Sequence, residues 1–86
     1  MLIYGSSVCP YTVYALAKCK EERLDFTYRD ISGAMCFLRE FLQYRDEEKK
    51  LFKPIKAQGS VGIPFFVFED GTKLFDLEKA IKKAKK

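Results

Sequence analysis

The stretch LIYGSSVCPYTVYALAKCKEER, residues 2–23, changes its hydrophobic pattern at Cys9 and Pro10. Residues 2–5 form a short apolar run closed by glycine, which is typical of a buried strand. Proline favours the first position of a helix, because the N–H that it lacks would have no partner there. The stretch therefore predicts a strand over residues 2–5 and a helix over residues 11–23, with Cys9 at the junction.

The predicted helix carries two neighbouring rows of side chains at helical spacing, which indicate its packing face. The first row consists of Val13, Leu16, Ala17 and the aliphatic stem of Lys20. The second row consists of Ala15 and Cys19, and we expect Cys19 to be a core residue.

Strand and helix patterns continue to alternate along the chain. Residues 24–31 (LDFTYRDI) alternate apolar and polar side chains and predict a half-buried strand. Residues 33–46 place apolar side chains at helical spacing and predict a second helix, capped by Ser32 or by the adjacent turn.

Residues 46–59 predict one or two further short helices. The acidic run from Asp46 to Glu48 favours a helix start, because acids are stabilised at the positive end of the helix dipole. Pro54 is expected to break or restart the helix, and Gly59 is typical of its C-cap.

The C-terminal part predicts a hairpin and a helix. Residues 62–71 (GIPFFVFEDG) predict a strand that ends in an Asp-Gly pair, which is a strong signal for a two-residue hairpin loop. Residues 72–75 then pair back as an edge strand, and Asp76 caps a last helix over residues 77–84. The elements follow the order β-α-β-α-β-β-α, which predicts an α/β protein.

The length of the chain and its charge indicate how many domains and which partners to expect. The 86 residues suffice for one domain, residues 1–86, and the net charge is +4. Much of that charge lies in residues 79–86 (KAIKKAKK), which we interpret as the solvated face of a terminal helix; no recognition module accompanies it, so we expect no nucleic-acid partner. No apolar run approaches the ~20 residues of a membrane span, and the chain's start lacks a signal-peptide pattern. We expect no membrane association.

The cysteine and histidine content limits the kinds of catalytic and metal-binding site that we expect. The three cysteines are Cys9, Cys19 and Cys36, and an odd number in a short chain does not indicate a disulfide scaffold. We expect a cytoplasmic protein in a reducing compartment. The chain has no histidine, which excludes Ser-His-Asp and Cys-His catalysis and histidine-bearing zinc sites. We expect no metal site.

The position of Cys9 predicts a reactive thiol. Unpaired N–H groups and the positive dipole end at a helix start stabilise a thiolate and lower the cysteine pKa. The hydroxyl of Thr12, three residues further on, can donate a hydrogen bond to the sulfur. We interpret Cys9 as a catalytic nucleophile supported by Thr12; the alternative is a small buried hydrophobe.

A mixed disulfide on Cys9 needs another thiol to resolve it. Cys19 lies ten residues along the same predicted helix, a rise of about 15 Å, whereas a disulfide needs Cα atoms within about 7 Å. Cys19 is therefore excluded. Cys36, in the first turn of the second helix, is a candidate resolving thiol, although a packing role is the preferred interpretation.

Several segments resemble the glutaredoxin family. CPYT at residues 9–12 resembles the signature Cys-Pro-Tyr-Cys with its last cysteine replaced, and GIPFFVFEDG at residues 62–71 resembles the family's segment with a cis-proline. The chain is similar in detail to short bacterial glutaredoxin-related proteins with a longer middle helix. The resemblance covers essentially the whole chain. It implies a thioredoxin-like (glutaredoxin) fold, with a four-stranded mixed sheet flanked by helices.

The resemblance also implies a binding site. It implies a cis peptide bond before Pro64, with the Ile63 backbone facing Cys9 and binding the substrate's backbone, and Tyr11 flanking the thiol. Asp76 would bind the amino group of glutathione, or it serves only as a helix cap. The family usually carries Lys or Arg shortly before the cysteine, where this chain has GSS. Lys53 and Lys56 are candidate replacements.

The implied function is thiol–disulfide exchange by a one-cysteine route on mixed disulfides. Glutathione or another low-molecular-weight thiol is the expected co-substrate and resolver, with no tightly bound cofactor. We expect a monomer that acts on disulfide-bearing proteins. Two alternatives are an iron–sulfur cluster carrier of the monothiol glutaredoxin type and a redox-inactive peptide-binding module.

Overall fold

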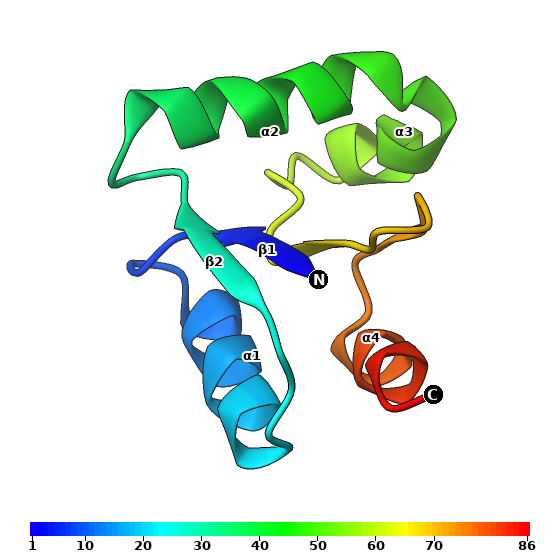
Figure 1. Cartoon of the computed structure of the whole chain (residues 1–86). Helices are drawn as coiled ribbons and strands as arrows, with labels where there is room; N and C mark the ends of the chain where they lie inside the picture. The colour runs from blue at the N-terminus through cyan, green and yellow to red at the C-terminus, as the bar shows by residue number, and fades with distance from the viewer.

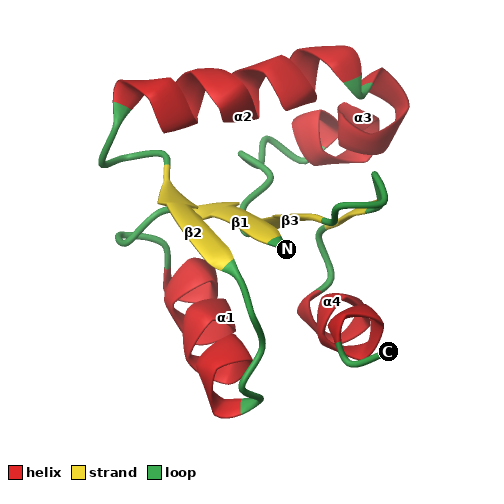
Figure 2. Ribbon diagram, viewed as in Figure 1, coloured by secondary structure: helices red, strands yellow, loops and turns green.

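The computed structural model describes residues 1–86 as a mixed α/β structure with four strands and four helices (Figure 1; Figure 2). In chain order these are β1 (Leu2–Gly5), α1 (Pro10–Glu21), β2 (Thr27–Asp30), α2 (Met35–Glu47), α3 (Lys49–Ala57), β3 (Phe65–Val67), β4 (Lys73–Leu74) and α4 (Leu77–Ala84). The predicted order is confirmed, with two helices between β2 and β3. None of the four helices has the length and apolar composition needed to cross a membrane.

The strands form one mixed sheet in the order β2-β1-β3-β4. β1 and β2 are parallel and are connected through α1, whereas β3 is antiparallel to both β1 and β4. In the middle of the sheet, Ile3 pairs with Tyr28 on one side and with Phe66 on the other. The four-stranded mixed sheet is therefore as predicted, and β4 lies at an edge.

Helices cover both faces of this sheet: α1 and α4 lie on one face, and α2 and α3 on the other (Figure 1). Because successive side chains of a strand point to opposite faces, Ile3 and Phe66 pack against the α1/α4 side, whereas Tyr4 and Phe65 pack against the α2/α3 side. The second core is largely aromatic, and the Phe52 ring lies 5.2 Å from that of Phe65. One sheet thus separates two cores.

The packing face of α1 differs from the prediction in one of its two rows. Thr12, Ala15 and Cys19 are buried, so the second predicted row faces the sheet. In the first row Leu16 is half-buried, and the exposed members are Val13, Ala17 and Lys20. The small buried side chains let α1 lie close to the sheet, and this narrow contact leaves most of the first row in solvent.

The start of α2 and the α2–α3 connection also differ from the prediction. Ala34, not Ser32, is the N-cap of α2, and no side chain caps the helix. Ser32 is engaged elsewhere, since its N–H and hydroxyl donate to Asp30. The acidic run is divided between two helices: Asp46 and Glu47 end α2, and Glu48 is the N-cap of α3, so a helix starts at the end of the run.

Pro54 lies inside α3 and does not break it. Its missing N–H forfeits one hydrogen bond of a short helix, and the complete burial of Phe52 on the same helix offsets that loss. The helix ends at its C-cap Gln58, and Gly59 follows with a φ of +72°. Gly59 thus marks the helix end as predicted, one residue beyond the cap.

The β3–β4 hairpin has a three-residue loop, residues 69–71, where two residues were predicted. The Phe68 N–H donates to the Thr72 carbonyl at 2.8 Å, and the Gly71 N–H donates to the Phe68 carbonyl at 3.0 Å. Gly71 has a φ of +92°, which only glycine adopts without strain. Glycine at this position makes the longer loop possible.

Candidate functional site

Cys9 lies where the chain leaves the sheet and enters α1. β1 ends at Gly5, a short loop follows, and Cys9 is the N-cap of α1 with Pro10 at the first helical position. The Cys9 N–H donates to the Ser6 carbonyl at 3.0 Å, and the Cys9 carbonyl accepts the Val13 N–H at 3.1 Å. The predicted position of the thiol at a helix start is confirmed.

The thiol of Cys9 is half-buried and electrostatically biased toward its ionised form. Burial raises its pKa, but the N–H and hydroxyl of Thr12 and the N–H of Tyr11 outweigh this effect, so the pKa of Cys9 is lowered. The Cys9 side chain does not form a geometric capping hydrogen bond with the first turn of α1. The arrangement favours a thiolate that is still open to a substrate.

Thr12 is completely buried beneath the thiol. Its Oγ1 accepts the Ser6 N–H at 3.3 Å, which leaves the hydroxyl hydrogen free to be donated toward Cys9. The threonine packs against Gly5, where an added Cβ would lie 2.4 Å from Thr12 Cγ2. Glycine at the end of β1 therefore allows the start of α1 to come close to the sheet.

The loop before Cys9 is tied to the end of β2 by a hydrogen-bond network that sequence reasoning missed. Ser6 Oγ lies 2.9 Å from Ser32 Oγ and accepts the Val8 N–H at 3.3 Å. Asp30 Oδ1 accepts the N–H and hydroxyl of Ser32 at 2.9 and 2.5 Å. Hydrogen bonds from Ser32 lower the pKa of Asp30 despite some desolvation, and Ser7 contributes to the same effect. The sequence contained a signal for this network, because polar residues follow the carboxyl ends of two neighbouring parallel strands.

The Tyr28 hydroxyl lies on the Cys9 side of the sheet and is buried without a hydrogen-bond partner. Burial raises its pKa first, and the negative charges of Asp30 and of an ionised Cys9 raise it further. Tyr28 thus keeps its proton next to the thiol region at neutral pH.

A groove of about 520 Å³ brings together the four residues predicted to bind substrate. These residues are Tyr11, Ile63, Pro64 and Asp76. The Ile63–Pro64 peptide bond is cis, as the resemblance implied. The predicted cap is confirmed as well, since the Asp76 carboxylate accepts the Lys79 N–H at 3.2 Å.

Cys9 and Thr12 do not line this groove, and Tyr11 connects the groove to them along the chain. Neither Lys53 nor Lys56 lines it, because both belong to α3 on the opposite face of the sheet. They do not replace the missing cation.

All three cysteines are free thiols, but their surroundings differ. Cys19 is completely buried, and burial raises its pKa. Cys36 is exposed in the first turn of α2 and does not line the groove. No three His, Cys, Asp or Glu side chains are grouped closely enough to hold a metal ion.

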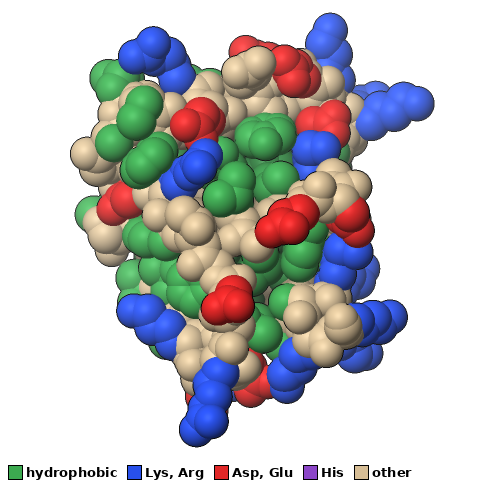
Figure 3. All heavy atoms as spheres, viewed as in Figure 1, with side chains coloured by type: hydrophobic (Ala, Val, Ile, Leu, Met, Phe, Trp, Pro, Cys, Tyr) green, Lys and Arg blue, Asp and Glu red, His purple; other side chains and the backbone are tan.

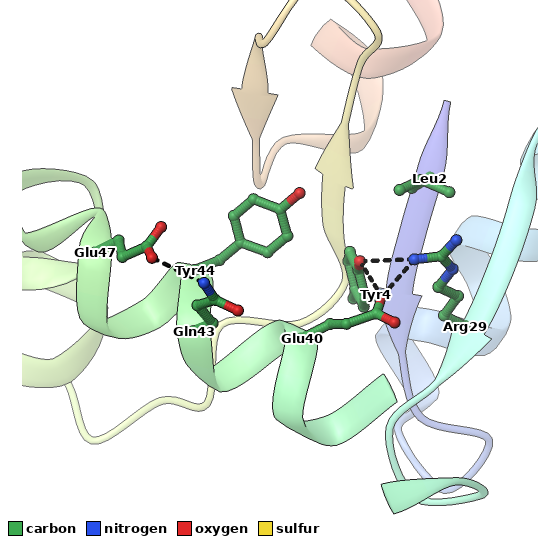
Figure 4. A pocket seen from close by; sticks show the side chains of 7 residues that line it. All are labelled: Leu2, Tyr4, Arg29, Glu40, Gln43, Tyr44 and Glu47. Atoms are coloured by element: carbon green, nitrogen blue, oxygen red, sulfur yellow. Dashed lines mark hydrogen bonds and ion pairs between the residues drawn. The ribbon is translucent and has the colours of Figure 1, made fainter. Parts of the chain in front are cut away.

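A second hollow, of about 340 Å³, lies between the β1–β2 pair and α2 (Figure 4). Within it, Glu40 accepts hydrogen bonds from the Tyr4 hydroxyl, at 2.7 Å, and from Arg29. The Arg29 guanidinium also donates to the Tyr4 hydroxyl at 3.2 Å. Burial, followed by the Glu40 contact, raises the pKa of Tyr4 to about 12. We infer that this hydrogen-bond network holds α2 against the sheet.

Comparison with known proteins adds one similarity. No protein-family model matches the chain, and no solved structure matches it. The chain is similar to an "uncharacterized protein" of Haemophilus influenzae, 27% identical over 78 residues that cover 91% of this chain and 90% of that protein.

Proposed function

We propose that the chain is a glutaredoxin-like thiol–disulfide oxidoreductase in which Cys9 acts without a partner cysteine at position 12. The observation that carries the proposal is a half-buried thiol with a lowered pKa at the start of α1. The neighbouring groove, with Tyr11 and the cis Ile63–Pro64 bond, supports it.

The architecture supports a thioredoxin-like fold as part of the same proposal. The four-stranded mixed sheet with helices on both faces (Figure 1) is the arrangement that the resemblance implies. Neither the N–H nor the carbonyl of Ile63 is used in a hydrogen bond within the protein's backbone. These groups are thus free to pair with an extended substrate backbone, as an added strand would.

In the first step, the Cys9 thiolate attacks one sulfur of a mixed disulfide. A new disulfide forms between Cys9 and that sulfur, the old S–S bond breaks, and the second sulfur leaves as a thiolate that takes a proton from water. The Thr12 hydroxyl and the N–H groups at the helix start hold the negative charge on Cys9 before the attack.

In the second step, an external small thiol resolves the intermediate. Its thiolate attacks the substrate sulfur bound to Cys9, and Cys9 leaves as the thiolate that the helix start stabilises. Cys19 is not available for this step, since α1 is continuous from Pro10 to Glu21 and Cys19 is completely buried within it. We propose glutathione or a similar small thiol of a reducing cytoplasm as the resolver. We also propose that the protein acts as a monomer.

Two substitutions test the assignment in an exchange assay with a glutathione mixed disulfide and excess reduced glutathione. We expect Cys9→Ser to reduce the rate to that of buffer and Cys36→Ser to keep the parent rate. Activity that survives Cys9→Ser would overturn the nucleophile. A loss in Cys36→Ser would make Cys36 the resolving thiol in place of the external one.

A further inference from the structure

The groove next to Cys9 combines an apolar floor with an acidic wall. Tyr11, Tyr14 and Ile63 are among its apolar lining, and its carboxylates are Asp76 and Glu78. Neither carboxylate forms an ion pair with any Lys or Arg of the chain. The Asp76 carboxylate caps α4 through the Lys79 N–H, but neither Asp76 nor Glu78 has an ion-pair partner within the protein.

The single basic residue of the lining forms an ion pair with an acid of its own helix. Lys18 Nζ lies 3.7 Å from Glu21 Oε2, one helical turn further along α1. None of the other Lys and Arg side chains lines the groove, and those around α4 lie at the periphery of the molecule (Figure 3). The groove therefore has no unpaired cation for an anionic ligand.

Apolar side chains extend from the groove past the thiol. Four of the seven exposed large hydrophobic residues fall within residues 8–14, and these are Val8, Tyr11, Val13 and Tyr14. Tyr11 and Tyr14 line the groove, and exposed apolar residues at a groove mark a surface that binds another molecule. Val8 precedes Cys9 in the chain, and Tyr11 and Tyr14 follow it, so exposed apolar side chains flank the thiol on both sides, which suits a polypeptide occupant.

We infer that the natural substrate is a mixed disulfide on a polypeptide segment that carries an apolar residue and a Lys or Arg near its cysteine. This inference rests on the proposed exchange activity and names its substrate class. The apolar residue would lie on Tyr11 and Ile63, and the basic residue would pair with Asp76 and Glu78. Glutathione, with two carboxylates and one ammonium group, fits this charge pattern less well.

The test compares three disulfides of 5-thio-2-nitrobenzoate: one with a capped peptide that contains Cys, Leu and two Lys, one with the same peptide carrying Glu for Lys, and one with glutathione. The protein carries Cys36→Ser, so that Cys9 is the accessible thiol. Its thiolate bonds to the peptide sulfur, and the coloured nitrobenzoate thiolate leaves with the electron pair of the broken bond. Each rate constant is divided by that of 2-mercaptoethanol with the same disulfide, which corrects for intrinsic reactivity.

We expect the normalised rate for the lysine peptide to exceed that for the glutamate peptide by about three- to tenfold at low salt, the range of a few exposed charge pairs. The ratio should fall as salt is added, because exposed charges are screened. In the double variant Asp76→Asn/Glu78→Gln, the ratio of the two peptide rates should be close to one. Asparagine at position 76 keeps the helix cap. The double variant Asp25→Asn/Glu69→Gln removes the same two charges at exposed residues outside the groove and should leave the ratio unchanged.

Three results would overturn the inference. Equal normalised rates for the two peptides, or the highest rate for glutathione, remove the substrate class and leave the exchange activity standing. A protein that reacts no faster than 2-mercaptoethanol with every disulfide, corrected for thiolate concentration, removes both proposals.

Discussion

The two hollows of this protein lie on opposite faces of one sheet and use their polar groups differently. In the α2-side hollow, Tyr4, Arg29 and Glu40 satisfy one another. On the other face, the Cys9 thiol is half-buried and open to a substrate, the Asp76 carboxylate has no ion-pair partner, and the Tyr28 hydroxyl has no hydrogen-bond partner. Groups that pair within the protein stabilise the fold, and groups left unpaired next to an exposed apolar surface are available to a ligand.

The largest expected effect is the loss of disulfide exchange when Cys9 is replaced, compared with a substitution in the α2-side hollow. Cys9→Ser should abolish disulfide exchange and leave the free energy of unfolding unchanged. Glu40→Gln should keep the exchange rate and lower the free energy of unfolding by up to about 1 kcal/mol, because the Arg29 pair is partly exposed to solvent. Exchange assays and urea unfolding of both variants check this. A loss of exchange activity in Glu40→Gln would contradict a purely structural role for the α2-side hollow.

The next effect concerns the close contact beneath the thiol. Gly5→Ala places a Cβ against Thr12, and we expect it to lower the free energy of unfolding by about 1–3 kcal/mol, as overpacking does. Because the displaced Thr12 would support the thiolate less well, the pKa of Cys9 should also rise. Gly33→Ala is the matched control, since the nearest atoms to a Cβ there lie 3.5 Å away. Equal stability of the two variants would show that the contact at Gly5 is not tight.

A smaller effect tests the hydroxyl of Thr12. Thr12→Val removes a donor that lowers the pKa of Cys9, so the pKa should rise toward that of a free thiol. The thiolate fraction and the exchange rate then fall at neutral pH, and the rate recovers at alkaline pH. Thr12→Ser keeps the hydroxyl and should retain the parent pH profile. An unchanged profile in Thr12→Val would remove the assigned role.

The last effect belongs to the α2-side hollow and appears only at alkaline pH. The pKa of Tyr4 is raised to about 12 in the folded protein, above its ordinary value of 10.0. The unfolded chain therefore loses this proton first, so the Tyr4 contribution to stability is present below pH 10 and is lost between pH 10 and 12. Urea unfolding across this range should show a decline that is weaker in Tyr4→Phe. An equal decline in both proteins would assign it to other groups.

Local rules predicted the features that depend on neighbours in sequence. The helix start at Cys9 and Pro10, the cap at Asp76 and the helix end near Gly59 each follow from the backbone demands of a few residues. The expected reactivity of Cys9 rests on the same local geometry, and the lowered pKa agrees with it.

The features that depend on docking were not predictable from the sequence. Val13 and Ala15 are both suitable for a buried row of α1, and the close contact at Gly5 decides between them. The Tyr4–Arg29–Glu40 network requires the β1–β2 register and the position of α2 together. Pro54 contradicts a local rule because the burial of Phe52 stabilises α3.

We propose above all that the helix start stabilises a thiolate at Cys9, and the rate of iodoacetamide alkylation against pH tests this most directly. The protein carries Cys36→Ser, and Cys19 is completely buried, so the reaction reports Cys9. We predict a midpoint below that of free cysteine in the same buffer. A midpoint equal to or above that of free cysteine would contradict the account and favour a binding module without redox activity.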